Sequence, residues 1–141
     1  MQRHKIPQAY LYRQVVHAKL YIEANYASHI DLEIISQEAC FSKFHFLRLF
    51  KESFGLTPNQ FLVDVRLRKA KELLRQGHSV QDTCWRVGYE SMSSFSLLFK
   101  KRIGVSPIRF MQACKSQRER LRANPLVFIP GCFAASFSSE E

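Results

Sequence analysis

The chain has 141 residues, and its 21 Lys and Arg against 12 Asp and Glu give a net charge of +9. This positive excess indicates a polyanionic partner, with nucleic acid as the first candidate and an acidic membrane surface as the second. Hydrophobic residues make up 46% of the chain and Gly and Pro number only five each, which excludes a chain that is disordered throughout, collagen-like or linker-rich.

Two helices are predicted at the start of the chain. Apolar residues recur at helical spacing over residues 9–25, which predicts the first helix. Asp31 is a suitable N-cap for a short second helix over residues 32–39. The apolar positions that define them are Leu11, Val15, Ala18 and Ile22 in the first helix, and Leu32, Ile35 and Ala39 in the second.

Two longer helices follow. Ser42 is expected to cap a third helix, which Gly55 ends because glycine readily adopts the left-handed conformation of a helix terminus. Thr57 and Pro58 predict the start of a fourth helix, which continues to about Arg75. The residues expected on the core side are Phe46, Leu49, Phe50 and Ser53 in the third helix, and Val63, Leu67, Ala70 and Leu74 in the fourth.

Three more helices complete the predicted fold. A fifth helix begins after Ser79, and a sixth covers residues 91–103. Ser106 and Pro107 open a short seventh helix that reaches about Ala113.

An internal repeat relates the third helix to the sixth. Residues 50–58 (FKESFGLTP) match residues 99–107 (FKKRIGVSP) at an offset of 49, and further upstream the offset becomes 48. Each copy has a short helix, a tight turn and a longer helix with basic residues, which is typical of a helix-turn-helix unit that binds DNA. A helical solenoid is the alternative, but such arrays usually need about three copies or more.

We therefore predict an all-α fold in which seven helices form two helix-turn-helix subdomains joined by a long linker helix. The first subdomain and the linker cover residues 1–77, the second covers 78–114, and a basic and then apolar tail covers 115–141. A linker of about 19 residues, at roughly 1.5 Å per residue, is about 28 Å long. This length approaches the ~34 Å of one DNA turn, so the two subdomains are expected to enter successive major grooves.

The outward sides of the third and sixth helices are the candidate DNA-reading surfaces. Arg48 is the best base reader, because a guanidinium can donate two hydrogen bonds to guanine O6 and N7. The candidate base-contacting residues are Phe44, Leu47, Arg48, Met92, Ser93, Ser94 and Leu97, and the candidate backbone-contacting residues are Lys43, His45, Lys51, Lys100 and Lys101. The alternative is that Phe44, Leu47 and Leu97 belong to the core and that His45 packs or faces solvent.

The predicted linker helix is itself basic. Its positive residues are Arg66, Arg68, Lys69, Lys71 and Arg75, beside Asp64 and Glu72. Contact with phosphates and a merely solvated face are both open interpretations of this charge.

These features resemble the AraC/XylS family of bacterial transcription regulators. The similarity covers residues 15–114 and is carried by residues 42–51, 66–74 and 87–107. It implies two helix-turn-helix motifs joined by a long helix, binding to promoter DNA and contact with RNA polymerase. By position, it assigns base reading to the same seven residues. Two departures are Cys84, where Ala is usual, and Leu97, where a polar or basic residue is common.

The tail beyond Cys114 lies outside this similarity. Its apolar part, residues 125–133, is expected to fold back on the helices or to pair between chains. Cys132 is the candidate redox or ligand sensor, against the alternative that all the cysteines are reduced and packed as small hydrophobes.

No enzymatic centre, metal site or cofactor is expected. The five His and four Cys share no metal-ligand spacing, and no nucleophile or phosphate-binding glycine motif occurs. The alternative function is a helical protein-interaction module that docks on RNA polymerase or another regulator without reading DNA. The expected partners are double-stranded DNA and RNA polymerase.

The chain is expected in the cytoplasm, without a membrane contact. No apolar run approaches the about 18 residues that would cross a bilayer. It is expected to be a short stand-alone family member, acting as a monomer or weak homodimer, or else a fragment.

Overall fold

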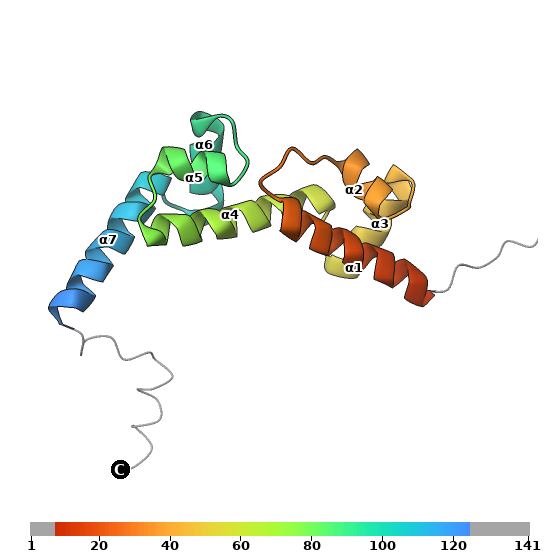
Figure 1. The fold of residues 1–141 in the computed structure, drawn as a ribbon, viewed down its shortest axis with the longest axis horizontal. Helices are drawn as coiled ribbons and strands as arrows, with labels where there is room; N and C mark the ends of the chain where they lie inside the picture. Colours follow the sequence, from red (N-terminus) through yellow and green to blue (C-terminus); the bar gives the residue numbers. More distant parts are fainter. Residues whose placement is uncertain (1–7, 125–141) are drawn as a thin grey trace, which may run out of the picture.

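The computed structural model describes residues 8–124, which form helices and no strand (Figure 1). The all-α prediction with seven helices is confirmed over this part of the chain. The helices are α1 (Gln8–Asn25), α2 (Leu32–Glu38), α3 (Lys43–Phe54), α4 (Pro58–Gln76), α5 (Val80–Arg86), α6 (Met92–Ile103) and α7 (Pro107–Ala123).

Side-chain caps explain where several helices begin. The carboxylate of Asp31 accepts a hydrogen bond from the Ile34 amide at 2.9 Å at the start of α2. Thr57 and Gln60 form a capping box at the start of α4, with the two bonds at 3.2 and 3.0 Å. Ser42 lies at the N-cap of α3 as predicted, but its side chain makes no capping hydrogen bond, so that part of the prediction is wrong.

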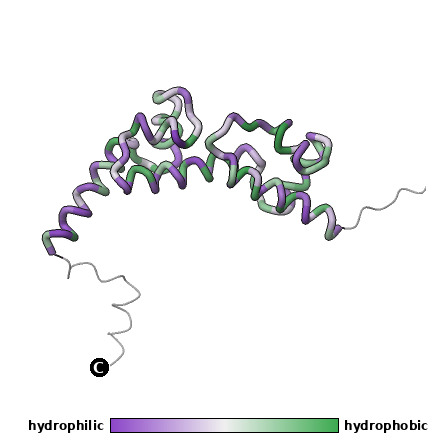
Figure 2. Tube along the Cα trace, in the orientation of Figure 1, coloured by the Kyte–Doolittle hydropathy of each residue, from purple (hydrophilic) through white to green (hydrophobic). Residues whose placement is uncertain are grey.

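The seventh helix is longer than the sequence interpretation allowed. The prediction ended it at about Ala113, whereas α7 continues to Ala123. No Gly or Pro interrupts residues 108–123, so nothing in this stretch breaks the helix. The positive charges of Arg120 and Arg122 in the last turn stabilise the helix, because they interact favourably with the negative end of its dipole. The basic start of the expected tail is therefore helical, and Figure 2 shows α7 as a largely hydrophilic helix. The apolar segment 125–133 and Cys132 lie outside the described residues.

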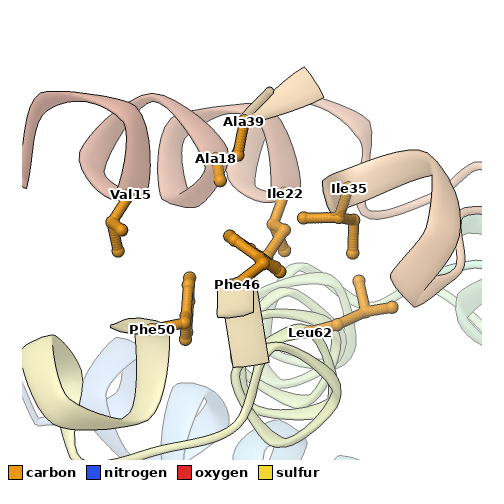
Figure 3. Close-up of a cluster of buried hydrophobic side chains, with 8 residues drawn as sticks. All are labelled: Val15, Ala18, Ile22, Ile35, Ala39, Phe46, Phe50 and Leu62. Carbon is orange, nitrogen blue, oxygen red and sulfur yellow. The ribbon is translucent and has the colours of Figure 1, made fainter. Parts of the chain in front are cut away.

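Two apolar clusters hold the helices together. The first cluster joins α1, α2, α3 and the start of α4, as drawn in Figure 3. The second joins the later part of α4 to α5 and α6. Their buried members are Val15, Ala18, Ile22, Ile35, Ala39, Phe46, Phe50 and Leu62 in the first cluster, and Leu67, Ala70, Leu74, Val80, Cys84, Val87, Phe95 and Phe99 in the second.

The predicted repeat is visible in these clusters. Phe46 and Phe50 correspond to Phe95 and Phe99 at the offset of 49, and all four side chains are fully buried. Each cluster is closed by one more ring from the next helix: Phe61 lies 5.9 Å from Phe50, and Phe110 lies 5.5 Å from Phe99 between ring centroids. The two copies therefore share both their core and the aromatic contact that closes it.

The repeat also includes the helix that packs under each unit, α1 in the first and α4 in the second. The sequence analysis did not predict this part of the repeat. Three buried residues of α1 recur in α4 at a constant offset of 52: Val15 with Leu67, Ala18 with Ala70, and Ile22 with Leu74. The start of α4 closes the first cluster and its later part supports the second. Because α4 has both roles, the two units share one continuous helix.

The prediction of core positions was wrong for Ser53. This residue is exposed, although it lies one helical turn after the buried Phe50. The next residue, Phe54, occupies the space beside Phe50 instead, with ring centroids 4.8 Å apart. Leu49 and Val63 are partly buried at the edges of the two clusters.

The turn between α5 and α6 requires glycine for two reasons. Gly88 has φ +93°, and a Cβ atom built there would lie 2.9 Å from the Ala27 carbonyl oxygen. Gly55, at the end of α3, has φ +73° and nothing within 4 Å of such an atom. The two glycines therefore share a backbone requirement but differ in their surroundings.

Replacing Gly88 with Ala should cost more than replacing Gly55. Gly55→Ala is expected to lower the free energy of unfolding by about 1–2 kcal/mol, which is the cost of holding a residue with a Cβ atom in the left-handed conformation. Gly88→Ala adds overpacking against a backbone carbonyl, so the total should reach about 2–5 kcal/mol. Urea denaturation followed by circular dichroism measures both, and equal losses would contradict the packing at Gly88.

Candidate nucleic-acid interface

Each unit presents a short helix, a turn and a longer second helix. In the view of Figure 1, α2 with the start of α3 and α5 with α6 lie on the upper side of the row formed by α1 and α4. The turns correspond as well, since Cys40 and Gly88 are 48 residues apart and both have positive φ, +58° and +93°. The two helix pairs that contain the candidate reading helices, α3 and α6, therefore lie on the same side of the row formed by α1 and α4.

The outward surface of α3 carries the aromatic and guanidinium groups that the sequence singled out. Phe44 is 82% exposed, so the alternative that it belongs to the core is wrong. Arg48 lies one turn further along and is also exposed. Leu47 is partly buried. Phe44 and Arg48 are therefore both accessible to a partner that contacts this side of α3.

The corresponding surface of α6 is less polar. Leu97 is 73% exposed and occupies the position that Arg48 has in the first unit. Met92, Ser93 and Ser94 are exposed in the first turn, and the Ser94 amide donates to the Ser91 hydroxyl at 3.3 Å as an N-cap contact. The two reading helices thus share their placement but differ in chemistry at equivalent positions.

The candidate backbone-contacting residues fall into two groups. Lys51, Lys100 and Lys101 are exposed and have no carboxylate within 4.0 Å among residues 8–124. Lys43 lies 3.4 Å from Glu33, with both side chains exposed, and His45 is partly buried with its ring edge-on to Phe41 at 5.2 Å. The first group is therefore available to phosphates, whereas the second already has partners within the protein.

The basic residues of α4 are mostly engaged within the protein. Arg68 lies 3.8 Å from Glu23, Lys69 lies 3.1 Å from Glu72, and the Arg75 guanidinium lies 5.5 Å from the Phe110 ring centroid. Arg66 donates hydrogen bonds to two backbone carbonyls in the α1–α2 loop. Sequence reasoning missed this role, because backbone acceptors have no residue signature.

Local charges and burial shift three pKa values. The Arg86 hydrogen bond, with help from His78, holds the pKa of Asp82 below its usual value. Burial raises the pKa of the Cys84 thiol, which fits a packed and unreactive cysteine. Burial also raises the pKa of Tyr89, although the charge of Arg66 opposes this shift. None of these groups lies on the outward surfaces of α3 or α6.

Two kinds of site are absent from the described part of the chain. Among residues 8–124, no three His, Cys, Asp or Glu side chains gather closely enough to hold a metal ion. No helix in the same range combines the length and apolar character that crossing a membrane requires.

The pairs α2–α3 and α5–α6 each bury one side in an apolar cluster and expose the outer side of the second helix, which defines a double helix-turn-helix domain. Residues 35–113, more than half of the chain, match the family model described as a helix-turn-helix domain. The chain belongs to the AraC-type helix-turn-helix family, which confirms the resemblance found in the sequence.

Curated relatives and a solved structure are similar to much of this chain. An uncharacterized HTH-type transcriptional regulator in the cgkA 5' region of Pseudoalteromonas carrageenovora is 31% identical over 102 residues, which are 72% of this chain and 61% of that protein. The HTH-type transcriptional activator RhaS of Escherichia coli is 32% identical over 88 residues, covering 62% of this chain and 32% of RhaS. The C-terminal domain of AraT, a response regulator from Geobacillus stearothermophilus, gives a TM-score of 0.68 at 29% identity and covers 71% of this chain and 84% of that chain. The chain thus spans less than two thirds of either curated relative.

Proposed function

We propose that this chain is a sequence-specific regulator of transcription that binds double-stranded DNA by inserting α3 and α6 into successive major grooves. The observation that carries this proposal is the pair of exposed helices, α3 and α6, held by one shared helix. Helix α4 has 19 residues, which corresponds to about 28 Å at roughly 1.5 Å per residue. With its flanking turns, this span approaches the ~34 Å that separates successive grooves on one face of B-DNA.

The two helices are expected to read different half-sites. In α3, Arg48 donates to guanine, and Phe44 and Leu47 contact thymine methyl groups. In α6, Leu97 and Met92 offer apolar contact, while the hydroxyls of Ser93 and Ser94 bond to bases or phosphates. Because the units are related by a shift along the chain and not by a twofold axis, the bound site should be asymmetric.

The regulatory role is supported by the names of two relatives. RhaS is described as a transcriptional activator, and the P. carrageenovora protein as a transcriptional regulator. By analogy, we assign this chain a cytoplasmic role at promoters, without enzymatic activity and with RNA polymerase as a partner. One chain carries both reading helices, so a monomer suffices to occupy a site that spans two grooves.

A salt titration tests the proposal directly. Duplexes bound by the wild type are first selected from a random pool, and the affinity for the best duplex is then measured by fluorescence anisotropy at several salt concentrations. Log K should fall linearly with log salt, and Lys101→Gln should reduce the slope by about 0.9, the value for one lost phosphate contact. Lys115→Gln removes the same charge from α7, away from α3 and α6, and should leave the slope unchanged.

The competing protein-interaction module gives the opposite result. Such a module would select no sequence from the pool. Its weak DNA binding would respond equally to the loss of either lysine, because only its overall charge would matter.

A further inference from the structure

The two units meet at a seam beside the middle of α4. The loop between α1 and α2 contributes Tyr26 and Ala27, and the turn between α5 and α6 contributes Gly88 and Tyr89 (Figure 1). A Cβ atom on Gly88 would lie 2.9 Å from the Ala27 carbonyl oxygen and 3.1 Å from that of Tyr26. Tyr26 packs against both apolar clusters. The loop of the first unit and the turn of the second are therefore in direct contact.

Arg66 contacts both sides of this seam. Its Nε donates to the Tyr26 carbonyl at 2.7 Å, and its Nη2 donates to the Ser28 carbonyl at 3.0 Å. The Cζ atom of the same guanidinium lies over the Tyr89 ring, 5.2 Å from its centroid, which is a cation–π distance. One side chain on α4 thus contacts the loop of the first unit by hydrogen bonds and the turn of the second by a cation–π interaction.

The position of Arg66 on α4 lets these contacts resist a rotation of one unit against the other. The helix joins the first cluster through Leu62 and the second through Leu67, and Arg66 lies between them. Bending or twisting α4 at this point would rotate one unit against the other. Such a rotation would pull the α1–α2 loop away from the α5–α6 turn, and the guanidinium opposes it by holding both.

The chemistry requires arginine. The planar guanidinium presents several N–H donors in one plane and can stack on an aromatic ring at the same time. The ammonium of lysine is a compact charge without a planar group, so it cannot keep both hydrogen bonds and the contact with the Tyr89 ring in the same geometry. A lysine at this position would keep the charge but lose the geometry.

We infer that Arg66 is a positioning residue that sets the orientation of α6 relative to α3, and thereby the half-site spacing that the protein accepts. The inference rests on the proposed function, since spacing has meaning only if both helices read DNA. Arg66 touches no base in this assignment. It acts through the relative placement of the two reading helices.

The first test measures tolerance to spacing. The tightest duplex selected by the wild type is compared with duplexes that carry one or two extra base pairs between the half-sites. Each insertion rotates one half-site by about 35° relative to the other. We expect about tenfold weaker binding per inserted pair for the wild type, similar to losing a base contact, but about threefold or less for Arg66→Lys and Arg66→Gln.

Arg68→Lys is the matched control. Arg68 lies two residues further along α4, is largely exposed, and has one carboxylate partner, Glu23, at 3.8 Å. This variant should keep the wild-type penalty for each insertion. Binding to a duplex with a single half-site should be equal for all variants, because α3 and α6 themselves are unchanged. An unchanged spacing penalty in Arg66→Lys would overturn the inference.

A second test needs no DNA. Residual dipolar couplings of the backbone amides in α3 and α6 report whether the two units share one alignment tensor. The wild type and Arg68→Lys should fit a single tensor, and Arg66→Lys should need two, with near-native amide shifts in both clusters. A single tensor in Arg66→Lys would refute the positioning role. If the wild type selects no duplex but the tensors separate as expected, the proposed function fails while the orienting contact stands.

Discussion

Phe99→Ala should remove about 3–5 kcal/mol from the free energy of unfolding, the usual cost of deleting a buried phenyl ring. Phe99 is fully buried, and its ring centroid lies 5.8 Å from that of Phe95 and 5.5 Å from that of Phe110. The substitution therefore opens the centre of the second cluster and frees the start of α7. Since domains of this kind are stable by about 5–15 kcal/mol in total, the loss is a large fraction.

Urea denaturation followed by circular dichroism measures this loss. Phe44→Ala is the matched control, because it deletes the same ring from a position that is 82% exposed. That change should stay within about 0.5 kcal/mol, as for other surface substitutions. A comparable loss in both variants would mean that Phe44 packs in the interior and that α3 presents a different side to solvent.

The second large effect concerns Arg48→Ala. Removing its guanidinium should reduce discrimination at one guanine by about 1–3 kcal/mol, which is roughly 5- to 150-fold in relative affinity. The physical reason is that Arg48 is exposed on α3 and pairs with no carboxylate among residues 8–124, so its donors are free for a base. Selection from a random pool should then return a broader set of sequences at that position only.

Lys100→Ala provides the contrast. It removes a positive charge from the last turn of α6, where phosphate contact is proposed, and should weaken binding to all sequences by a similar factor. If Arg48→Ala instead weakened all sequences equally and kept the same preferred bases, Arg48 would contact phosphate and the base assignment would be wrong.

Arg48 and Leu97 differ in chemistry although the repeat makes their positions equivalent. The two residues occupy matching positions on α3 and α6, but one offers hydrogen-bond donors and the other an exposed apolar surface. The buried phenylalanines of the two units are identical, whereas most of their outward positions differ, with the exposed pair Lys51 and Lys100 as an exception. Packing therefore constrains the inner side of both helices alike and leaves the outer sides free to specialise.

Much of the fold followed from the sequence because its signals act over a few residues. Asp31, Thr57 and Ser79 cap the helices that they were expected to cap, since a side-chain oxygen reaches the amide three residues on. The repeat identified the two central rings of each cluster, Phe46 and Phe50 in the first and Phe95 and Phe99 in the second. The errors arose where a neighbour competed for the same space, as Phe54 does with Ser53, and where the interpretation ended α7 too early.

By itself, the amino-acid sequence determined the helices, the two-unit repeat and the residue types on α3 and α6, because helical periodicity and capping are local properties. The orientation of one unit against the other was decided only by the tertiary structure. Arg66 donates to carbonyls that lie 40 and 38 residues away along the chain. Because every residue has a backbone carbonyl, no pattern of side chains in the sequence predicts this contact. It exists only once folding has brought the α1–α2 loop beside the middle of α4 and the Tyr89 ring.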